Sequence, residues 1–335
     1  MALAARPVAK RTTGRFAVKD RVLIVRLSAI GDVVMALPAA ASIKASNPSA
    51  KVAWVVDHRI RELLIGHRAI DKVYPIFTDR RVRRNPARWR VMLKQHRELA
   101  EFHAEVGIDL HGHAKSSIAL RASKAPERYT LDPKDPLSRI LGGKLVFSRP
   151  NQHRVEAYLD AVQRAGFPYR RYDFDLPLNA AIQAHVRSLL GDGNWITLHA
   201  GGTHPKKIWP IERFIEIAKW LHGEGHRLVL VGGRGEERLV EPLLASVPCE
   251  TLVGKVGLLE VAEAIRRAKL HISGDTGTAH LAAAVGTKCV TVFGHMPASV
   301  YHPFGQPNAV VQCGSSAADV PVERVMEKVR ERLHE

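Results

Sequence analysis

The chain contains few cysteines and no long apolar run. Three cysteines occur among its 335 residues, and their spacings match neither a metal-binding cluster nor a disulfide framework: Cys249, Cys289 and Cys313. No window approaches the roughly 18 to 20 apolar residues that a membrane-spanning helix needs. Residues 1–19 lack the apolar core of a secretory signal. We therefore predict a cytoplasmic protein that is neither secreted nor membrane-spanning.

Residues 1–19 also contain no acidic side chain. Organellar transit peptides and disordered tails share this composition, and we predict a flexible basic N-terminal tail. Over the whole chain 50 lysines and arginines outweigh 33 acidic residues, which gives a formal net charge of +17 and a pI near 10.1. Such an excess implies an anionic partner: nucleic acid, an acidic membrane surface or a phosphorylated substrate. Charge alone does not choose among the three.

Two familiar cofactor signatures are incomplete. Residues 231–235 (VGGRG) are not the full dinucleotide fingerprint, which disfavours a hydride-transfer enzyme. His111 and His113 could be two ligands of a metal ion, but the sequence spacing places no third ligand beside them. Asp173 and Asp175 resemble the Asp-x-Asp of metal-dependent glycosyltransferases, yet they lie in a linker-like region rather than after a nucleotide-binding strand. We predict no metal site and no cofactor.

Short apolar runs alternate with helical patterns in both halves of the chain. We predict strands at 22–27, 51–57, 72–76, 108–110, 195–199, 227–231, 270–273 and 289–293. This alternation predicts an α/β protein with parallel sheets. Residues 169–181 are polar and lack a helical stripe. We therefore predict an N-terminal domain at 20–170, a linker at 171–181 and a C-terminal domain at 182–335.

A glycine turn, Ser28-Ala29-Ile30-Gly31-Asp32, follows the first strand. A carboxylate at this place lies near amide donors and still reaches solvent, so Asp32 is suited to accept a proton. Aspartate also caps helices well, and the turn alone leaves that simpler role open for Asp32.

A second turn, residues 273–286 (SGDTGTAHLAAAVG), follows a predicted strand and opens an apolar helix. Its free backbone N–H groups would face an anion such as a diphosphate. Thr276 and Gly277 would donate to phosphate, and His280 lies one helical turn further on. Asp275 would fix the loop rather than meet the phosphate, because its charge would be repelled. A core or capping role remains open for His280.

Three further positions in the second half follow predicted strands. Lys207, or its neighbour Lys206, precedes the helix that starts near Pro210, where an ammonium group would meet phosphate oxygens. Thr203 would add a hydroxyl. Glu236 would accept hydrogen bonds from ribose hydroxyls, by analogy with dinucleotide sites. Taken singly, a solvated surface lysine and an ordinary glycine turn explain these features equally well.

The densest basic run surrounds apolar residues on a possible amphipathic helix: Arg80, Arg81, Arg83, Arg84, Arg88, Arg90, Lys94 and Arg97. It would rest on anionic lipid headgroups, or it is simply a solvated helix face. No recognised nucleic-acid-binding module accompanies it, and we predict no nucleic-acid partner.

Four ordered motifs together carry a resemblance to a known family. Residues 21–38 (RVLIVRLSAIGDVVMALP), 109–121 (DLHGHAKSSIALR), 207–210 (KIWP) and 273–286 resemble the bacterial ADP-heptose:lipopolysaccharide heptosyltransferases. The likeness runs from about Arg21 to the C-terminus. The chain departs from the pattern at residues 201–203 (GGT), where the first inner-core heptosyltransferase is richer in threonine, and the loop before Lys207 is one residue longer.

The resemblance implies a GT-B fold, in which two Rossmann-like domains face each other across a deep cleft. It also implies inversion at the anomeric carbon without an essential metal. On this reading Asp32 matches the general base, and the departing ADP is stabilised by Lys207, Thr203 and the amides of Thr276 and Gly277. Glu236 matches the ribose-binding acid. Lys115 and Arg121 fall where the family presents basic side chains to the acceptor.

The function that follows is transfer of L-glycero-D-manno-heptose from ADP-heptose to the inner core of lipopolysaccharide, on a lipid A-Kdo acceptor. The enzyme would be cytoplasmic and peripheral at the inner face of the cytoplasmic membrane, in contact with its anionic surface. Three alternatives stay open: a related transferase with another sugar or a protein acceptor, a metal-dependent transferase that uses Asp173 and Asp175, and a non-enzymatic basic nucleotide-binding module.

Overall fold

The computed structural model describes residues 19–78, 86–202 and 204–335. The predicted tail therefore lies outside the described residues except for Lys19, and so does Thr203. The chain divides into two compact units, one ending at Asp175 and the other running from Leu176 to Glu335. The division falls inside the segment 171–181 that the sequence predicts as a linker. No helix among the described residues is long and apolar enough to cross a membrane.

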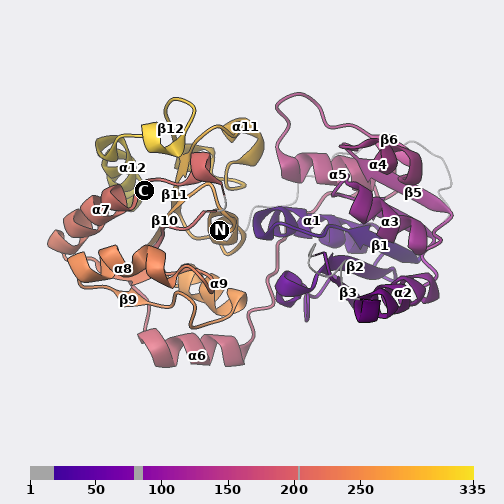
Figure 1. Ribbon diagram of the computed structural model, residues 1–335, viewed down its shortest axis with the longest axis horizontal. Coiled ribbons are helices and arrows are strands. Elements are labelled where there is room, and N and C mark those ends of the chain that lie inside the picture. Colours follow the sequence, from indigo (N-terminus) through magenta and orange to yellow (C-terminus); the bar gives the residue numbers. More distant parts are fainter. Residues whose placement is uncertain (1–18, 79–85, 203) are drawn as a thin grey trace. The chain divides into compact units, whose positions relative to one another are not determined.

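The N-terminal unit is built on a parallel six-stranded sheet (Figure 1). Its strands are β1 (Arg21–Val25), β2 (Lys51–Asp57), β3 (Lys72–Ile76), β4 (Val106–Asp109), β5 (Glu127–Leu131) and β6 (Lys144–Val146). They lie in the order β3-β2-β1-β4-β5-β6, which is the Rossmann order. The four strands predicted in this half are confirmed, and β5 and β6 extend the sheet.

The strands of this unit are joined by α1 (Ile30–Ser46), the 3-10 helix η1 (His58–Leu63), α2 (Pro86–Glu101), α3 (Ala114–Ala122), α4 (Pro136–Leu141) and α5 (Arg154–Arg164). Buried apolar side chains of β1 and β2 pack with Leu99, Phe102 and Leu120 to form the core on one face of the sheet. Helix α1 is buried along most of its length because its residues are almost all apolar.

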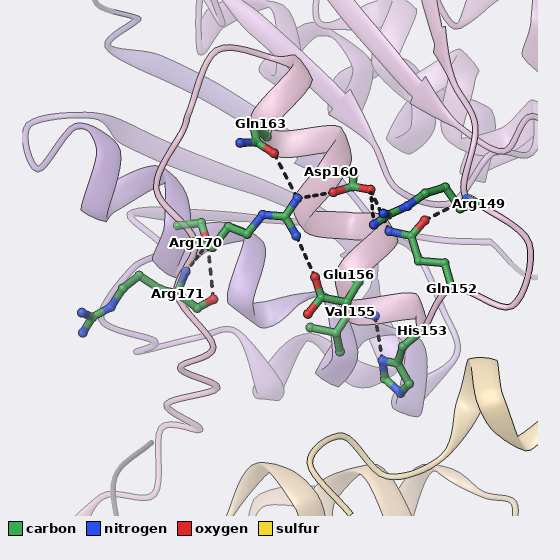
Figure 2. A network of polar contacts seen from close by, with 10 residues as sticks. Arg149, Gln152, His153, Val155, Glu156, Asp160, Gln163, Arg170 and Arg171 are labelled. Atoms are coloured by element: carbon green, nitrogen blue, oxygen red, sulfur yellow. Dashed lines mark hydrogen bonds and ion pairs between the residues drawn. The ribbon is translucent and has the colours of Figure 1, made fainter. Parts of the chain in front are cut away.

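The chain leaves α5 and is tied back onto it (Figure 2). Arg170 pairs with Glu156 at 2.7 Å and with Asp160, and it donates to Gln163 at 3.0 Å. The N–H of the next residue, Arg171, donates to the Ser42 hydroxyl on α1 at 2.9 Å. These contacts fix the last residues of the N-terminal unit to its own helices.

The C-terminal unit repeats the same strand order. Its strands are β7 (Trp195–His199), β8 (Arg227–Leu230), β9 (Glu250–Thr251), β10 (Leu270–Gly274), β11 (Cys289–Phe293) and β12 (Val310–Gln312), all parallel, in the order β12-β11-β10-β7-β8-β9. The four strands predicted here are confirmed. Trp209 stacks edge-on against Phe214 at 4.9 Å and anchors the core, and its indole N–H donates to the Val320 carbonyl at 2.9 Å.

The helices of this unit are α6 (Ala180–Leu190), α7 (Ile211–Gly223), α8 (Glu237–Ser246), α9 (Leu258–Arg266), α10 (Gly277–Ala284), α11 (Ala298–Tyr301) and α12 (Val322–His334). Short 3-10 turns lie at η3 (Pro205–Lys207), η4 (Pro307–Ala309) and η5 (Ala317–Asp319).

Each sheet reverses its direction of growth at one place, between β1 and β4 in the N-terminal unit and between β7 and β10 in the C-terminal unit. In open α/β sheets, ligands bind beyond the carboxyl ends of the strands at such a point. The turn that carries Asp32 follows β1, and the turn that carries Asp275 follows β10. Both predicted loops therefore stand where a ligand site is expected in their own unit.

Candidate active site

Asp32 lies in the first turn of α1, and its carboxylate has three partners. Oδ2 accepts a hydrogen bond from the Ala29 N–H at 3.2 Å, so the residue does stabilise the helix start. Oδ1 pairs with Nη2 of Arg26 at 2.6 Å and accepts from the Tyr158 hydroxyl at 3.3 Å. The side chain is still 29% exposed. Capping and access to solvent therefore coexist in Asp32.

The pKa of Asp32 lies well below its usual value. Burial by itself would raise this pKa, but the Arg26 guanidinium, the Ala29 N–H and the more distant Arg154 outweigh burial and lower it to about 2. The carboxylate is therefore ionised at every physiological pH. For Asp32 to take up a proton, its contact with Arg26 must weaken.

Two buried arginines, Arg26 and Arg154, and the exposed Lys134 lie around Asp32. Arg26 is 3% exposed and donates from Nη1 to the Leu110 carbonyl at 2.6 Å. The Tyr158 ring lies against two guanidinium groups, with Arg26 at 5.5 Å and Arg154 at 5.0 Å from its centre. Lys134 is exposed, and partial loss of solvation together with repulsion from Arg26 lowers its pKa. This group of cations suits an anionic ligand.

Sequence reasoning missed Arg26, Lys134, Arg154 and Tyr158 as parts of this site. One signal was available, because Arg26 lies inside the apolar run predicted as a strand at 22–27, and a charged side chain in such a run needs a partner. Tyr158 is 126 residues away from Asp32 in the chain, and no local pattern connects the two.

The loop after β4 borders the same group. Asp109 is fully buried and accepts from the N–H groups of His111 and Gly112 at 2.8 and 3.1 Å, and from the Ser116 hydroxyl at 2.8 Å. The pKa of His111 is lowered to about 3 by burial, Arg26 and His113, so this ring is neutral at pH 7. Among the described residues, no three or more histidine, cysteine or acidic side chains are grouped to hold a metal ion.

The two predicted acceptor residues lie at opposite ends of α3. Lys115 is exposed in the first turn, and its ammonium group donates to the Thr78 carbonyl at 2.8 Å. Arg121 is exposed in the last turn. They are six positions apart in the helix, about 9 Å along its axis. The structure therefore places Lys115 near the carboxyl edge of the sheet and Arg121 away from it.

In the C-terminal unit, the predicted lysine and aspartate are paired. Nζ of Lys207 lies 2.7 Å from Oδ2 of Asp275. The Asp275 side chain is 5% exposed and that of Lys207 is 24% exposed, so the ammonium group is held in place and remains accessible. Asp275 therefore orients Lys207, as a loop-fixing residue would. Lys206 is exposed, and its N–H donates to Nδ1 of His204 at 3.3 Å.

Glu236 is joined to the loop at β10 through a histidine that the sequence did not single out. Oε2 of Glu236 accepts from the Gly233 N–H at 2.7 Å and lies 3.3 Å from Nε2 of His199. Nδ1 of His199 lies 3.1 Å from the Thr276 hydroxyl. His199 ends β7, Glu236 follows β8 and Thr276 follows β10, so one imidazole links the turns after three strands.

This chain of contacts continues inward through two further side chains. The Thr276 hydroxyl lies 3.0 Å from that of Thr278, which lies 3.0 Å from Nε2 of the fully buried His271. Burial and the nearby His199 lower the pKa of His271 to about 3, so His271 is neutral. We name the side chains of Glu236, His199, Thr276, Thr278 and His271 the donor-side polar chain.

The carboxylate at the end of the donor-side polar chain is an acceptor. An ionised Glu236 can only accept, so an Nε2–H of His199 points to it. Each further pair of side chains along the donor-side polar chain shares one hydrogen bond within the protein. The N–H groups that open α10, at Gly277 and the residues after it, are further donors at this turn.

Two glycines lie close to the Glu236 carboxylate. A Cβ atom at Gly232 would lie 2.7 Å from Oε2 of Glu236, and one at Gly201 would meet Oε1 of the same carboxylate. The absence of side chains at these two positions therefore leaves room for the acid. His280, predicted as a phosphate donor, is buried within α10, where 6% of it is exposed.

The chain is similar to known proteins along most of its length. A model of the family described as glycosyltransferase family 9 (heptosyltransferase) matches residues 92–329. Lipopolysaccharide heptosyltransferase 1 of Escherichia coli O18:K1:H7 (strain RS218 / NMEC) is 26% identical over 326 residues, which cover 93% of this chain and 97% of that protein.

Two solved structures of E. coli heptosyltransferase WaaC are similar over 93% of this chain and 99% of theirs, each at 25% identity. The structure with ADP gives a TM-score of 0.79, and the structure with ADP-2-deoxy-2-fluoro heptose gives 0.74.

Proposed function

Since this chain belongs to glycosyltransferase family 9, the heptosyltransferase family, we propose that it moves L-glycero-D-manno-heptose from ADP-heptose to the inner core of lipopolysaccharide. The observation that carries this proposal is the arrangement after β7, β8 and β10: an accessible lysine held by Asp275, the open start of α10, and an acid beside two glycines. This set of groups suits a nucleoside diphosphate. The likeness to structures that hold ADP and an ADP-heptose analogue supports the same donor.

The N-terminal unit would hold the acceptor, and the reaction would begin with proton transfer to one of the unit's side chains. Asp32 would take the proton of the acceptor hydroxyl. The oxygen of that hydroxyl would attack the anomeric carbon of the heptose. The basic residues around Asp32 suit the phosphate or carboxylate groups of a lipid A-Kdo acceptor, and Lys115 stands at the same edge of the sheet.

The C-terminal unit would hold the donor and receive the leaving group. As the bond from the anomeric carbon to ADP breaks, its electron pair stays on the phosphate oxygen. Lys207 and the N–H groups that open α10 would stabilise the added negative charge. A single displacement of this kind inverts the anomeric carbon. Because protein groups supply the positive charge, we propose that no metal and no cofactor is required.

We further propose that the enzyme works in the cytoplasm as a peripheral protein at the inner face of the cytoplasmic membrane, because its acceptor is anchored in lipid and its formal net charge is +17. The predicted basic run supports contact with anionic lipid only in part, since Arg80, Arg81, Arg83 and Arg84 lie outside the described residues.

The test is the release of ADP from ADP-heptose, measured with and without a truncated lipopolysaccharide core. We expect release that depends on the acceptor and persists in excess EDTA, with one heptose added to the core by mass spectrometry. Loss of activity on chelation would favour a metal-dependent enzyme that uses Asp173 and Asp175. In the structure these acids pair with Arg171 at 2.9 Å and Arg68 at 2.6 Å.

Two other outcomes would contradict the proposal. Transfer from a different nucleotide sugar, or to a protein, would indicate a relative with another substrate. Salt-sensitive binding of oligonucleotides, with no ADP released from any sugar donor, would indicate a nucleotide-binding module without enzymatic activity.

A further inference from the structure

Large apolar side chains that face solvent gather on one short stretch of the N-terminal unit. Four of those among the described residues fall within residues 137–147: Leu137 at 42% exposure, Ile140 at 77%, Leu145 at 37% and Phe147 at 61%. The stretch comprises α4, a two-glycine turn and β6, which is the outer strand of its sheet (Figure 1). We name these four side chains and their basic neighbours the α4-β6 surface.

The folded core does not require these side chains. Other residues of the same stretch fill the interior: Ser138 and Val146 are buried, and the Thr130 hydroxyl donates to the Gly142 carbonyl at 2.9 Å. An exposed isoleucine on a helix of six residues adds little to the stability of the fold. A cluster of exposed apolar side chains of this kind marks a surface that meets another body.

The charges of the stretch indicate what that body is. Residues 133–149 contain four basic side chains, Lys134, Arg139, Lys144 and Arg149, and one acid, Asp135. Lys134 belongs to the group around Asp32, and Arg149 pairs with Asp160 at 3.4 Å. Arg139 is exposed, and Lys144 is 67% exposed although it lies 3.9 Å from Glu127. Asp135 is occupied in capping α4, where it accepts from the Ser138 N–H at 2.8 Å. Protein–protein interfaces are depleted in lysine at their centres, whereas apolar side chains among lysines and arginines match an anionic bilayer.

The α4-β6 surface lies at the edge of the sheet that carries Asp32. The N–H and hydroxyl of Ser148, the residue after Phe147, both donate to Asp132 at 2.8 Å. Asp132 pairs with Arg154 at 2.6 Å. The Arg154 guanidinium in turn lies over Tyr158, whose hydroxyl contacts Asp32. A short series of contacts within one unit thus connects the surface to the proposed base.

We propose that the α4-β6 surface seats the enzyme on an anionic lipid bilayer. Ile140 and Phe147 enter the boundary between headgroups and acyl chains, while Arg139 and Lys144 contact the anionic headgroups. The assignment rests on the membrane contact included in the proposed function and names the surface that makes it. A lipid-anchored acceptor would then reach the basic residues around Asp32 from the same side of the unit.

The experiment measures co-sedimentation of the full chain with vesicles of phosphatidylglycerol and phosphatidylcholine, and with phosphatidylcholine alone. We expect binding only to the anionic vesicles. Ile140→Asp should weaken this binding by about tenfold or more, because it removes an inserting side chain and adds a like charge. Ile65→Asp is the matched control: Ile65 is 55% exposed and lies between β2 and β3, toward the opposite border of the same sheet. It should bind as the wild type does.

A second measurement separates this inference from the proposed function. Transfer to a deacylated, soluble acceptor should be equal in the wild type and in Ile140→Asp, because neither the donor site nor Asp32 is altered. If the wild type transfers no heptose at all, the proposed function is wrong. The vesicle-binding measurement does not depend on transfer, so it still tests whether the α4-β6 surface binds lipid.

Four results would overturn the inference. The first is a wild type that does not bind anionic vesicles, and the second is an Ile140→Asp variant that binds them as tightly as the wild type. The third is loss of binding when Arg90 and Arg97 on α2 are replaced by glutamine, together with unchanged binding by Ile140→Asp. The fourth is a change of oligomeric state in Ile140→Asp by light scattering without lipid, which would make this surface an interface between copies of the chain.

Discussion

Asp32 and Arg26 form a pair in which each residue limits the other. The guanidinium keeps the carboxylate ionised and oriented, and it also makes the carboxylate a weak base. A general base with a pKa near 2 needs help to take a proton. Substrate binding would supply that help if an anionic group of the acceptor drew Arg26 away.

Asp32→Asn should lower kcat by about a hundredfold to ten-thousandfold, the usual contribution of a general base. The amide keeps the shape and can still accept at its oxygen, so ADP affinity measured by calorimetry should remain close to wild type. Glu101→Gln, an exposed acid at the end of α2, serves as the control and should leave kcat unchanged. Near-normal turnover in Asp32→Asn would exclude Asp32 as the base.

The Arg26 pair also predicts a pH dependence. Because Arg26 lowers the pKa of Asp32, Asp32 should not produce an acidic limb in kcat/KM above about pH 3 in the wild type. Arg26→Gln removes the largest opposing effect and leaves burial, so the pKa of Asp32 rises. Activity that survives the substitution should then fall on the acid side at a higher pH than in the wild type. Identical acid limbs in the two proteins would contradict the pairing.

At the scale of secondary-structure elements, the donor-side polar chain joins turns that follow β7, β8 and β10. His199 is the shared member and is only 7% exposed. Its imidazole fits both neighbours at once, because its two nitrogens point in different directions. We infer that it positions the proposed ribose acid relative to the proposed diphosphate turn.

Two amide substitutions each keep one of the two contacts of His199. In His199→Gln the NH₂ group lies near the position of Nε2 and can still donate to Glu236, but the contact with Thr276 is lost. In His199→Asn the shorter side chain reaches only toward Thr276, and the contact with Glu236 is lost. If the bridge matters, both His199→Gln and His199→Asn should raise the Kd for ADP by about threefold to tenfold, the range for one lost hydrogen bond. With saturating donor, kcat should change little. Wild-type ADP affinity in both variants would show that the bridge is merely structural.

A buried threonine tests the stability of the same chain. Thr278→Val keeps the shape but leaves Nε2 of the buried His271 without its partner, which should cost about 1 to 3 kcal/mol in the free energy of unfolding. Thr278→Ser restores the hydroxyl and should recover most of that loss in urea titrations. Equal stability of the valine and serine variants would contradict the proposed contact.

At the scale of the whole molecule, two units of the same strand order carry different kinds of polar group. The N-terminal unit gathers arginines and a lysine around one carboxylate, and the C-terminal unit presents a paired lysine and an open helix start. The proposed division of labour, with the acceptor on the first unit and the donor on the second, predicts that each ligand stabilises its own unit.

ADP should therefore protect backbone amides of the C-terminal unit alone in hydrogen exchange. We expect slower exchange at residues 232–236 and 275–280, and no change at residues 106–113 of the N-terminal unit. At about 100 times its Kd, ADP should stabilise the folded state by about 2.7 kcal/mol. Protection limited to residues 106–113 would reverse the proposed assignment of donor and acceptor.

Local patterns in the sequence determined the elements and the places of the loops. Apolar runs predict four strands in each sheet, since a strand buried on both faces must be apolar along its length. The shorter or more polar strands β5, β6, β9 and β12 are not predicted. Because parallel strands all end at one edge, the loops of Asp32, Lys207, Glu236 and Asp275 could be assigned to carboxyl ends before any coordinates were known.

Only the tertiary structure decided the partners. Tyr158 meets Asp32 across 126 positions of the chain, and His199 meets Thr276 across 77. Neither contact leaves a local signal, because a pairing between distant positions depends on strand order and register rather than on spacing. The low pKa of Asp32, the contacts of the donor-side polar chain and the exposure of Ile140 all arise from such packing, which composition and periodicity do not encode.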